Sequence, residues 1–122
     1  NSKKGQHYGS RIVFDNEGHL YFGVGDRGNR DVNPQDLTRD GGKVYRLNLD
    51  GSIPDDNPFV NEAEYKKAVF SYGHRNPQGM VVHPETGQVW ENEHGPRKRE
   101  RDRAVGSWLQ RTKNIINCLH KF

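Results

Sequence analysis

The 122-residue chain is poor in cysteine, in apolar runs and in hydrophobic residues overall. Its single cysteine, Cys118, excludes an internal disulfide and says little about the cellular compartment. No apolar run approaches the roughly 20 residues of a membrane-spanning helix, and we recognise no signal peptide, although one could precede Asn1. Hydrophobic residues make up 30% of the chain and charged residues 29%, with a mean hydropathy of -1.11. Such a composition predicts a thin, turn-rich β-sheet protein or a fragment of a larger one, and the missing initiator methionine fits a fragment.

Helical spacing of apolar residues is also nearly absent, and the segment 61–69 (NEAEYKKAV) is the one helix-like candidate before the C-terminal region. Apolar residues instead form short bursts that are rich in β-branched and aromatic types and are separated by Gly, Pro, Asn and Asp. These bursts are RIVF (11–14), HLYFGV (19–24), KVYRLNL (43–49), AVFSYG (68–73), GMVV (79–82) and QVWE (88–91). The pattern predicts an all-β fold.

Two β-hairpins are predicted from these bursts, RIVF-DNEG-HLYF and MVV-HPETG-QVWE, because Asp, Asn, Pro and Gly supply the turns between them. The hairpins resemble each other. Ile12 and Met80 open equivalent strands about 68 residues apart, and each hairpin leads into a polar glycine loop, GVGDRG or NEHGPR. Repetition of a multi-strand unit at this length is typical of a β-propeller, of which about two blades are present.

The loop GVGDRG (23–28) also spells the G-x-G-x-x-G pattern of dinucleotide-binding proteins. That pattern binds a pyrophosphate only where the loop opens a helix, whose free amides hold the anion. Here Pro34 and the pair Gly41 and Gly42 follow, with no apolar stripe at helical spacing. We therefore interpret the loop as a glycine-rich turn that leaves a strand.

The net charge of +3 averages two unlike regions. Residues 1–96 carry 11 Lys and Arg against 14 Asp and Glu, a net charge of -3, whereas residues 97–122 carry 8 against 2, a net charge of +6. The basic character therefore belongs to the C-terminal region, and the acidic body argues against a nucleic-acid-binding protein.

Two stretches in the body have residue types that could carry chemistry. His7 in GQHYGSR precedes a strand, and a neutral imidazole is a suitable general base at physiological pH; the alternative is a surface histidine. In SYGHRNPQG, Arg75 offers a rigid fork for anionic or carbonyl oxygens and Asn76 both donates and accepts. The alternative there is a structural corner in which Arg75 pairs with a neighbouring acid.

A third stretch, ENEHGPR, combines Glu91 and Glu93 with a Gly95-Pro96 step whose backbone carbonyls could face a hard cation such as calcium. The alternative is a solvated acidic turn. Two other candidates fail on spacing. The aspartates of the preceding loop do not form an EF-hand, and Cys118-x-His120 is too sparse for zinc; the aspartates are Asp26, Asp31, Asp36 and Asp40.

Taken together, HYGSRIVFD, GKVYRLNLDGSIPDDNPF, SYGHRNPQGM and NEHGPR closely resemble the soluble aldose sugar dehydrogenases of the glucose/sorbosone dehydrogenase family, which use pyrroloquinoline quinone (PQQ). The likeness covers roughly residues 7–97. It implies a six-bladed β-propeller of several hundred residues, periplasmic or secreted, with the quinone over the central channel, and it implies two cofactors, PQQ and calcium. On this resemblance the rest of the propeller lies outside this chain.

The resemblance also implies roles for individual residues. His7, four positions before Arg11, matches the catalytic base; Arg75 and Asn76 match the pair that contacts the quinone carbonyls; Gly95 and Pro96 match the step whose backbone oxygens bind calcium. The implied reaction removes a proton from the C1 hydroxyl of an aldose and passes hydride to C5 of the quinone, which yields a lactone. The sequence identifies neither the preferred sugar nor the electron acceptor.

After HGPR the chain departs from the family pattern, at the point where the charge balance also changes. We expect residues 1–96 to be partial propeller and residues 97–122 to be a divergent basic tail that is out of frame or chimeric. A two-blade fragment leaves sheet edges exposed and the quinone site incomplete, so we expect it to be poorly stable and inactive alone. The alternative function is a non-catalytic propeller module that binds a ligand or a protein.

Overall fold

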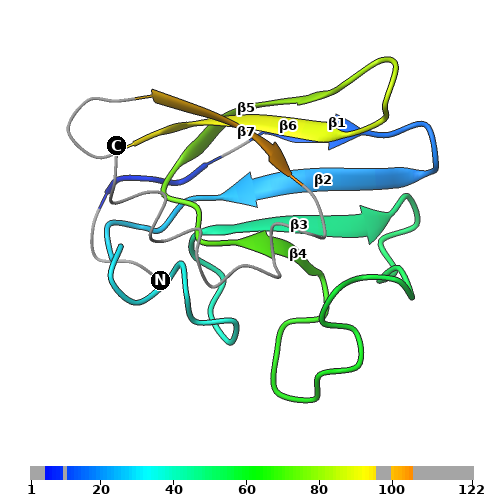
Figure 1. The fold of residues 1–122 in the computed structure, drawn as a ribbon. Helices are drawn as coiled ribbons and strands as arrows, with labels where there is room; N and C mark the ends of the chain where they lie inside the picture. Colours follow the sequence, from blue (N-terminus) through cyan, green and yellow to red (C-terminus); the bar gives the residue numbers. More distant parts are fainter. Residues whose placement is uncertain (1–4, 10, 96–99, 106–122) are drawn as a thin grey trace.

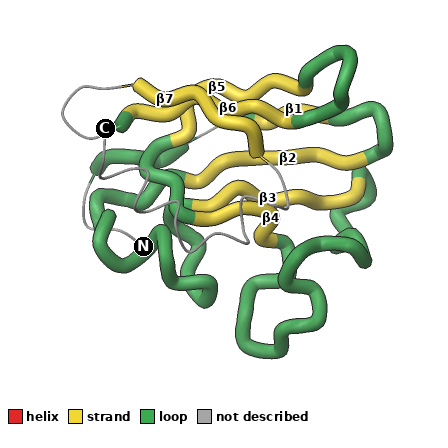
Figure 2. The backbone as a smooth tube through the Cα atoms, in the orientation of Figure 1, coloured by secondary structure: helices red, strands yellow, loops and turns green. Residues whose placement is uncertain are grey.

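The computed structural model describes residues 5–9, 11–95 and 100–105, and for 100–104 only the backbone. Within this part the chain forms strands and turns and no helix, so the prediction of an all-β fold is confirmed (Figures 1 and 2). The strands are β1 (Ile12–Phe14), β2 (His19–Val24), β3 (Lys43–Asn48), β4 (Val69–Tyr72), β5 (Pro77–Val82), β6 (Val89–His94) and β7 (Glu100–Val105). No helix of the described residues is long and apolar enough to cross a membrane.

The first sheet is an antiparallel meander in the order β1-β2-β3-β4. The predicted first hairpin is confirmed, with Ile12 opposite Phe22. Its turn is stabilised by Asp15, whose Oδ1 accepts the backbone N–H groups of Glu17 and His19, each at 2.9 Å. Short polar side chains bond to nearby backbone groups in this way at turns. The residues DNEG were therefore sufficient to predict this turn from the sequence.

The second sheet has the order β5-β6-β7, also antiparallel. The second predicted hairpin is confirmed, with Val82 opposite Val89. Strand β7 was not expected, because it lies beyond residue 97 in the basic region, and it pairs with β6 over its whole length. The two sheets fit two blades of a partial β-propeller, the architecture that the hairpin repeat predicted.

A small apolar core holds the two sheets together. Tyr21, Val44 and Phe70 come from the first sheet, and Val89 and Val105 come from the second. The rings of Tyr21 and Phe70 meet edge to face at 5.3 Å, a favoured aromatic geometry. The core is limited, as the composition predicted.

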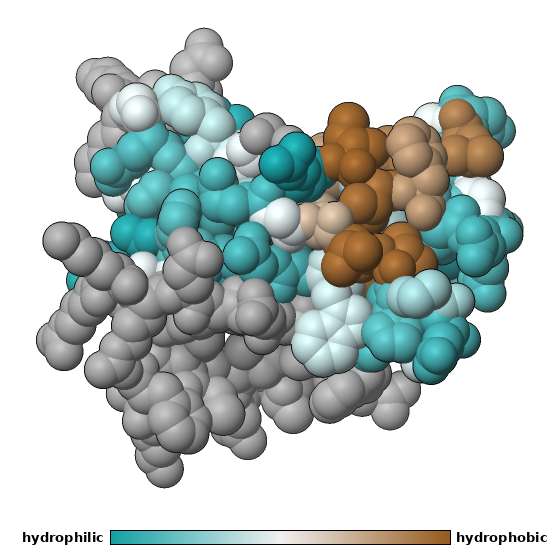
Figure 3. Space-filling model, turned by 90° about the horizontal axis from the view of Figure 1, so that it is seen from above, coloured by the Kyte–Doolittle hydropathy of each residue, from teal (hydrophilic) through white to brown (hydrophobic). Residues whose placement is uncertain are grey.

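Large apolar side chains remain on the surface, where Figure 3 shows an apolar patch over the region of β1 and β5. Ile12 and Phe14 of β1 and Val81 of β5 are each more than half exposed. Because β1 and β5 are the first strands of their sheets and contact each other, the patch lies at the line where the sheets meet.

The helix-like candidate at 61–69 does not form a helix. The segment consists of turns that lead into β4, and the Lys66 amide donates to the Leu37 carbonyl of another loop at 3.2 Å. The Phe59 ring packs against the rings of Tyr65 and Tyr72. A helix of nine residues is marginal in isolation, so contacts with other parts of the chain decide its conformation.

The chain segments that carry the candidate site gather at one end of the sheets (Figure 1). The end of β2, the start of β3 and the end of β4 lie side by side there, because Lys43 pairs with both Val24 and Tyr72. The start of β5 and the end of β6 lie together in the same way, through the pair Pro77 and Glu93. The loops beyond these strand ends are 25–42 and 73–76, and Gly95 follows β6; hydrogen bonds described below join segment 5–9 to this end.

Candidate active site at the loop end of the sheets

His7 is held by a short hydrogen bond to a buried carboxylate. Its Nδ1 lies 2.6 Å from Oδ1 of Asp26, and the two side chains are 16% and 0% exposed. Because a carboxylate only accepts hydrogen bonds, Nδ1 carries a proton, and in the neutral ring Nε2 then keeps its lone pair. His7 is therefore a fixed imidazole in the tautomer that a general base requires, rather than a freely rotating surface histidine.

The backbone around this pair is strained on both sides. His7 and Arg27 have φ values of 59° and 57°, in the left-handed region that residues other than glycine rarely adopt. The Arg27 amide donates to the His7 carbonyl at 3.3 Å, and the Arg27 guanidinium lies 4.2 Å from the centre of the Tyr8 ring. These contacts keep the two segments together despite the strain.

Gly25 explains why the loop GVGDRG needs glycine. A Cβ at Gly25 would overlap the His7 carbonyl and would approach Oδ1 of Asn76 to 3.1 Å. The loop continues into turns and not into a helix, so it offers no helical N-terminus for a phosphate. Close approach of three chain segments requires the glycine.

Asp26 and Glu93 join the histidine segment to the Arg-Asn segment. The Asp26 amide donates to the Arg75 carbonyl at 2.7 Å. Glu93, 1% exposed, accepts the amide of Arg75 at 2.6 Å and that of Asn76 at 3.3 Å through Oε2. Hydrogen bonds to a carboxylate are the stronger kind, so β6 fixes the backbone of this segment.

The side chains of Arg75 and Asn76 differ in how they are used. The Arg75 guanidinium donates to the His94 carbonyl at 2.8 Å and makes no ion pair with any described residue. Oδ1 of Asn76 accepts the Gly9 amide at 3.3 Å and Nε2 of Gln78 at 3.0 Å. Arg75 thus places a positive charge next to an amide of fixed orientation.

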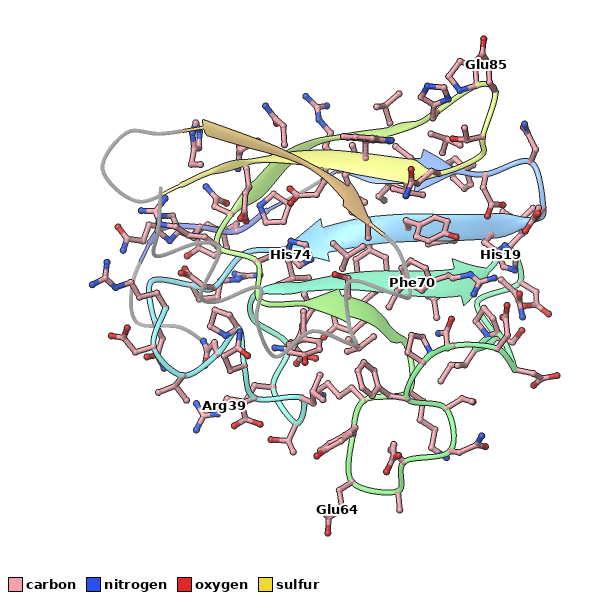
Figure 4. All side chains as sticks on the ribbon, viewed as in Figure 1. His19, Arg39, Glu64, Phe70, His74 and Glu85 are labelled. Atoms are coloured by element: carbon pink, nitrogen blue, oxygen red, sulfur yellow. The ribbon has the colours of Figure 1, made fainter. Side chains whose placement is uncertain are left out.

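The acidic residues of ENEHGPR are buried, so the stretch is not a solvated turn. Glu91 is 2% exposed, and its Oε1 lies 3.2 Å from Nδ1 of His74, whose Nε2 lies 2.8 Å from the Ser71 hydroxyl. Figure 4 shows His74 at the loop end of the sheets. Ligand atoms of His74, Glu91 and Glu93 lie within 4.8 Å of one another and could hold a cation, but Glu93 already binds two amides.

The predicted calcium step is only partly described. Gly95 is buried and directly follows β6, at the same end as Arg75 and Asn76. Pro96 lies outside the described residues. Carbonyl oxygens at such a position are suitable ligands for calcium, and they would need further ligands to reach its usual six to eight.

A second group of possible cation ligands, Asp15, Glu17 and His19, lies at the opposite end of the sheets, where Figure 4 labels His19. Burial raises the pKa of Asp15, but hydrogen bonds from His19 and Glu17 outweigh it, so the pKa lies below its usual value. The Arg46 guanidinium lies 3.1 Å from Nε2 of His19. A cation already faces this group, and we assign no metal to it.

The structure brings together His7, Arg75, Asn76 and Gly95, which the sequence identified as candidates. It adds Asp26 and Glu93, which the sequence did not assign to these roles. Both stood within the quoted loops, but their partners are 19 and 18 residues away in the chain. Only the fold could pair them.

Comparison of the sequence with known families and proteins gives a consistent result. The family model described as Glucose / Sorbosone dehydrogenase matches residues 1–104. Aldose sugar dehydrogenase YliI of Escherichia coli K12 is 47% identical over 93 residues, which are 76% of this chain and 25% of that protein. Quinoprotein glucose dehydrogenase B of Acinetobacter calcoaceticus is 34% identical over 108 residues, with 74% and 22% covered. The chain thus spans about a quarter of the length of these relatives.

Solved structures agree. The apo form of the soluble aldose sugar dehydrogenase of E. coli superposes with a TM-score of 0.81 at 43% identity, over 86% of this chain and 30% of that one. The PQQ-bound form of the aldose sugar dehydrogenase of Streptomyces coelicolor gives 0.73 at 33% identity, over 87% and 30%.

Proposed function

Because the chain belongs to the glucose/sorbosone dehydrogenase family, we propose that it carries the proton-accepting half of the active site of a PQQ-dependent aldose sugar dehydrogenase. The observation that carries this proposal is the 2.6 Å hydrogen bond between His7 and Asp26, in one cluster with Arg75 and Asn76. The PQQ-bound relative and the relative named a quinoprotein support the cofactor.

In this proposal His7 is the general base. Nε2 accepts the proton of the hydroxyl at C1 of the sugar, since Nδ1 is occupied by its bond to Asp26. The Asp26 carboxylate stabilises the imidazolium that forms and keeps the ring from turning, which is the role of the carboxylate in other His-Asp pairs. Burial of Asp26 strengthens this interaction because no water competes for it.

The residues next to His7 suit a quinone that carries carboxylate groups. Arg75 supplies a planar, permanently charged donor for carbonyl or carboxylate oxygens, and Asn76 supplies an amide. When bound, PQQ would supply the acceptor for the hydride from C1 of the sugar, and the oxidised sugar would leave as its lactone. The protein's contribution is to orient both reactants and to stabilise negative charge with Arg75.

Calcium belongs to the finer part of the proposal. The Gly95 carbonyl, and that of Pro96 by the family resemblance, would be ligands, with the remaining ones from elsewhere in the protein. Calcium there would place a divalent charge close to Arg75. A periplasmic or secreted location is likewise proposed from the resemblance, and neither the preferred sugar nor the electron acceptor is assigned.

Calorimetric titration of PQQ into the chain, with calcium and then with EDTA, tests the proposal. We expect saturable, calcium-dependent binding that Arg75→Ala weakens by about tenfold or more, because a charge-assisted contact is lost. Arg30→Ala is the matched control. It also removes an arginine, but the Arg30 side chain is 69% exposed and its ion pair is with the exposed Asp31, at 3.5 Å. Equal loss of affinity in both variants would overturn the assignment of Arg75 to the quinone.

The alternative is a non-catalytic propeller module that binds a ligand through the same loops. Such a module has no use for a histidine locked in one tautomer beside a buried carboxylate. Binding of PQQ that is indifferent to calcium and to Arg75 would favour the alternative.

A further inference from the structure

Lys43 is a fully buried lysine whose ammonium group faces backbone carbonyls. It is the first residue of β3, at the loop end of the sheets, and is 0% exposed. Its Nζ donates to the carbonyls of Asn33 at 2.6 Å, Gly41 at 2.7 Å and Pro34 at 3.4 Å. It forms no ion pair with any described residue. A buried charge without a carboxylate partner is costly and calls for an explanation.

The ammonium closes the long loop between β2 and β3. Asn33 and Pro34 stand near the middle of the loop 25–42 and Gly41 stands near its end, and all three carbonyls converge on one nitrogen. An ammonium has three donors on one atom and can serve three carbonyls, which a backbone amide cannot. Without the ammonium, these three carbonyls would have fewer hydrogen-bond donors.

The clamped loop supports the His7 side of the site. Nδ2 of Asn33 donates to the Asp26 carbonyl at 3.0 Å, and the Asn29 amide donates to the same carbonyl at 3.1 Å. Asp26 in turn holds Nδ1 of His7. A path of hydrogen bonds therefore runs from Lys43 through Asn33 and Asp26 to His7.

The same loop supports the Arg75 side. The Gly73 amide donates to the Pro34 carbonyl at 3.0 Å, and the His74 amide donates to the Gly42 carbonyl at 3.1 Å. Gly42 has a φ of 71°, and a Cβ there would lie 2.6 Å from the His74 carbonyl oxygen. The segment that leads into Arg75 thus rests on Pro34, which Lys43 holds, and on Gly42, which follows Gly41.

We propose that Lys43 is the positioning residue of the site: by binding the carbonyls of Asn33, Pro34 and Gly41, it fixes the loop on which both the His7–Asp26 pair and the Arg75 segment are built. It acts through these groups and touches no reactant. The inference rests on the proposed function for the identity of the ligand, but the geometry it explains, the fixed tautomer of His7, can be measured without any ligand.

Nitrogen NMR of the His7 ring in the 122-residue chain tests the proposal. In the parent chain we expect a single tautomer with the proton on Nδ1. In Lys43→Met, which keeps the length of the side chain, we expect the two tautomers to exchange and the Asp26 amide to exchange with solvent roughly tenfold faster, the equivalent of about one hydrogen bond. Lys66→Met is the matched control. Lys66 forms an ion pair with Asp40 of the loop 25–42, but its side chain is 39% exposed.

Asn33→Ala provides a second variant in case Lys43→Met does not fold. It breaks the link from the clamp to the Asp26 carbonyl and leaves the lysine in place, so His7 should again lose its single tautomer. If either variant keeps the sheets folded, as judged by protected amides in β2 and β3, and leaves the His7 signals unchanged, the proposal is wrong.

Titration of PQQ into the same variants separates this inference from the proposed function. If the parent chain binds PQQ, Lys43→Met should bind it about tenfold more weakly while Lys66→Met binds normally. If the parent chain does not bind PQQ, the proposed function fails, whereas a changed His7 tautomer in Lys43→Met still supports the positioning role.

Discussion

His7 owes its orientation to one oxygen of Asp26, which it shares with a backbone amide. Oδ1 of Asp26 accepts both Nδ1 of His7 at 2.6 Å and the Gly28 amide at 2.7 Å. The carboxylate is therefore itself fixed, and it transmits that order to the imidazole. A histidine with one nitrogen tied and the other available is prepared for proton transfer before any substrate arrives.

Asp26→Ala should remove the single tautomer of the His7 ring. Without the carboxylate, the proton on Nδ1 loses its acceptor, so the tautomer with the proton on Nε2 should become populated. Nitrogen NMR of the ring measures this change. Asp31→Ala, at a side chain that is 87% exposed, should leave the ring unchanged, and a retained single Nδ1–H tautomer in Asp26→Ala would contradict the account.

Lys43 should give the chain an unusual dependence of stability on pH. Burial lowers the pKa of Lys43 to about 8, although the carboxylates of Asp36 and Asp40 partly oppose it. Between pH 8 and the value of 10.5 for an unfolded lysine, the unfolded state binds more protons, so the free energy of unfolding contributed by this group rises with pH. Urea denaturation at pH 7, 8 and 9 measures it.

Tyrosine ionisation does not obscure that trend at these pH values. Burial raises the pKa of Tyr21 to about 12 and also raises that of Tyr45, so in the fold both stay protonated over this range, and in the unfolded chain their ordinary pKa is 10.0. Lys43→Met should abolish the rise and Lys66→Met should keep it. A fall in stability from pH 7 to 9 in the parent chain would contradict the assignment.

Individual site residues differed in how well the sequence predicted them. His7, Arg75 and Asn76 were identified because their types and spacing match a known family. Glu93 and Asp26 have the same importance in the structure, yet a carboxylate is ordinarily solvated. Nothing local shows that Asp26 binds His7, 19 residues away, or that Glu93 binds amides 17 and 18 residues away. Lys43 was missed for the same reason, since a lysine that opens a strand usually faces water.

Glu93 of β6 fixes the segment 73–76, because its carboxylate accepts the backbone amides of Arg75 and Asn76. Glu93→Gln removes the charge and leaves the shape, so the amides of Arg75 and Asn76 should exchange with solvent about tenfold faster or more. Hydrogen exchange followed by NMR measures both amides. Glu85→Gln, in the exposed turn of the same hairpin that Figure 4 labels, is the control. Unchanged exchange at Arg75 in Glu93→Gln would show that Glu93 does not hold the segment.

Phe70 of β4 belongs to the apolar core that joins the two sheets. Its ring is 9% exposed and lies against Tyr21 and 5.4 Å from the Arg46 guanidinium. Phe70→Ala should lower the free energy of unfolding by about 3 kcal/mol or more, whereas Phe14→Ala, at a ring that is 61% exposed, should change it by about 0.5 kcal/mol or less. Urea denaturation of both variants gives the comparison, and similar losses would contradict the assigned core.

Elements were predictable where local signals agreed. Both hairpins have turn residues at the right positions and alternating apolar residues, and both formed as expected. Segment 61–69 had helix-forming residues but too little length, and contacts with residues 37 and 59 prevailed. Strand β7 has almost no apolar residues and forms because β6 offers a free edge.

At the level of the whole chain, two sheets and one cluster of loops form roughly a quarter of the length of the related enzymes. The cluster draws on segment 5–9, both sheets and three loops, so it depends on the packing of the sheets as well as on local turns. Large apolar side chains of β1 and β5 are exposed in this chain. This is expected for blades whose neighbours in a larger propeller would cover them. The expected boundary at residue 97 stays a prediction; the family match ends at residue 104 and β7 ends at Val105.

The most direct test of the central claim is an amide NMR titration of the 122-residue chain with PQQ in the presence of calcium. The account predicts saturable shifts at His7, Arg75, Asn76 and Gly95, reversed by EDTA, and none at the turns of Gly18, Gly51 and Gly87 at the opposite end of the sheets. Shifts confined to that opposite end, or no shifts at His7 and Arg75 in a chain whose sheets are folded, would contradict it.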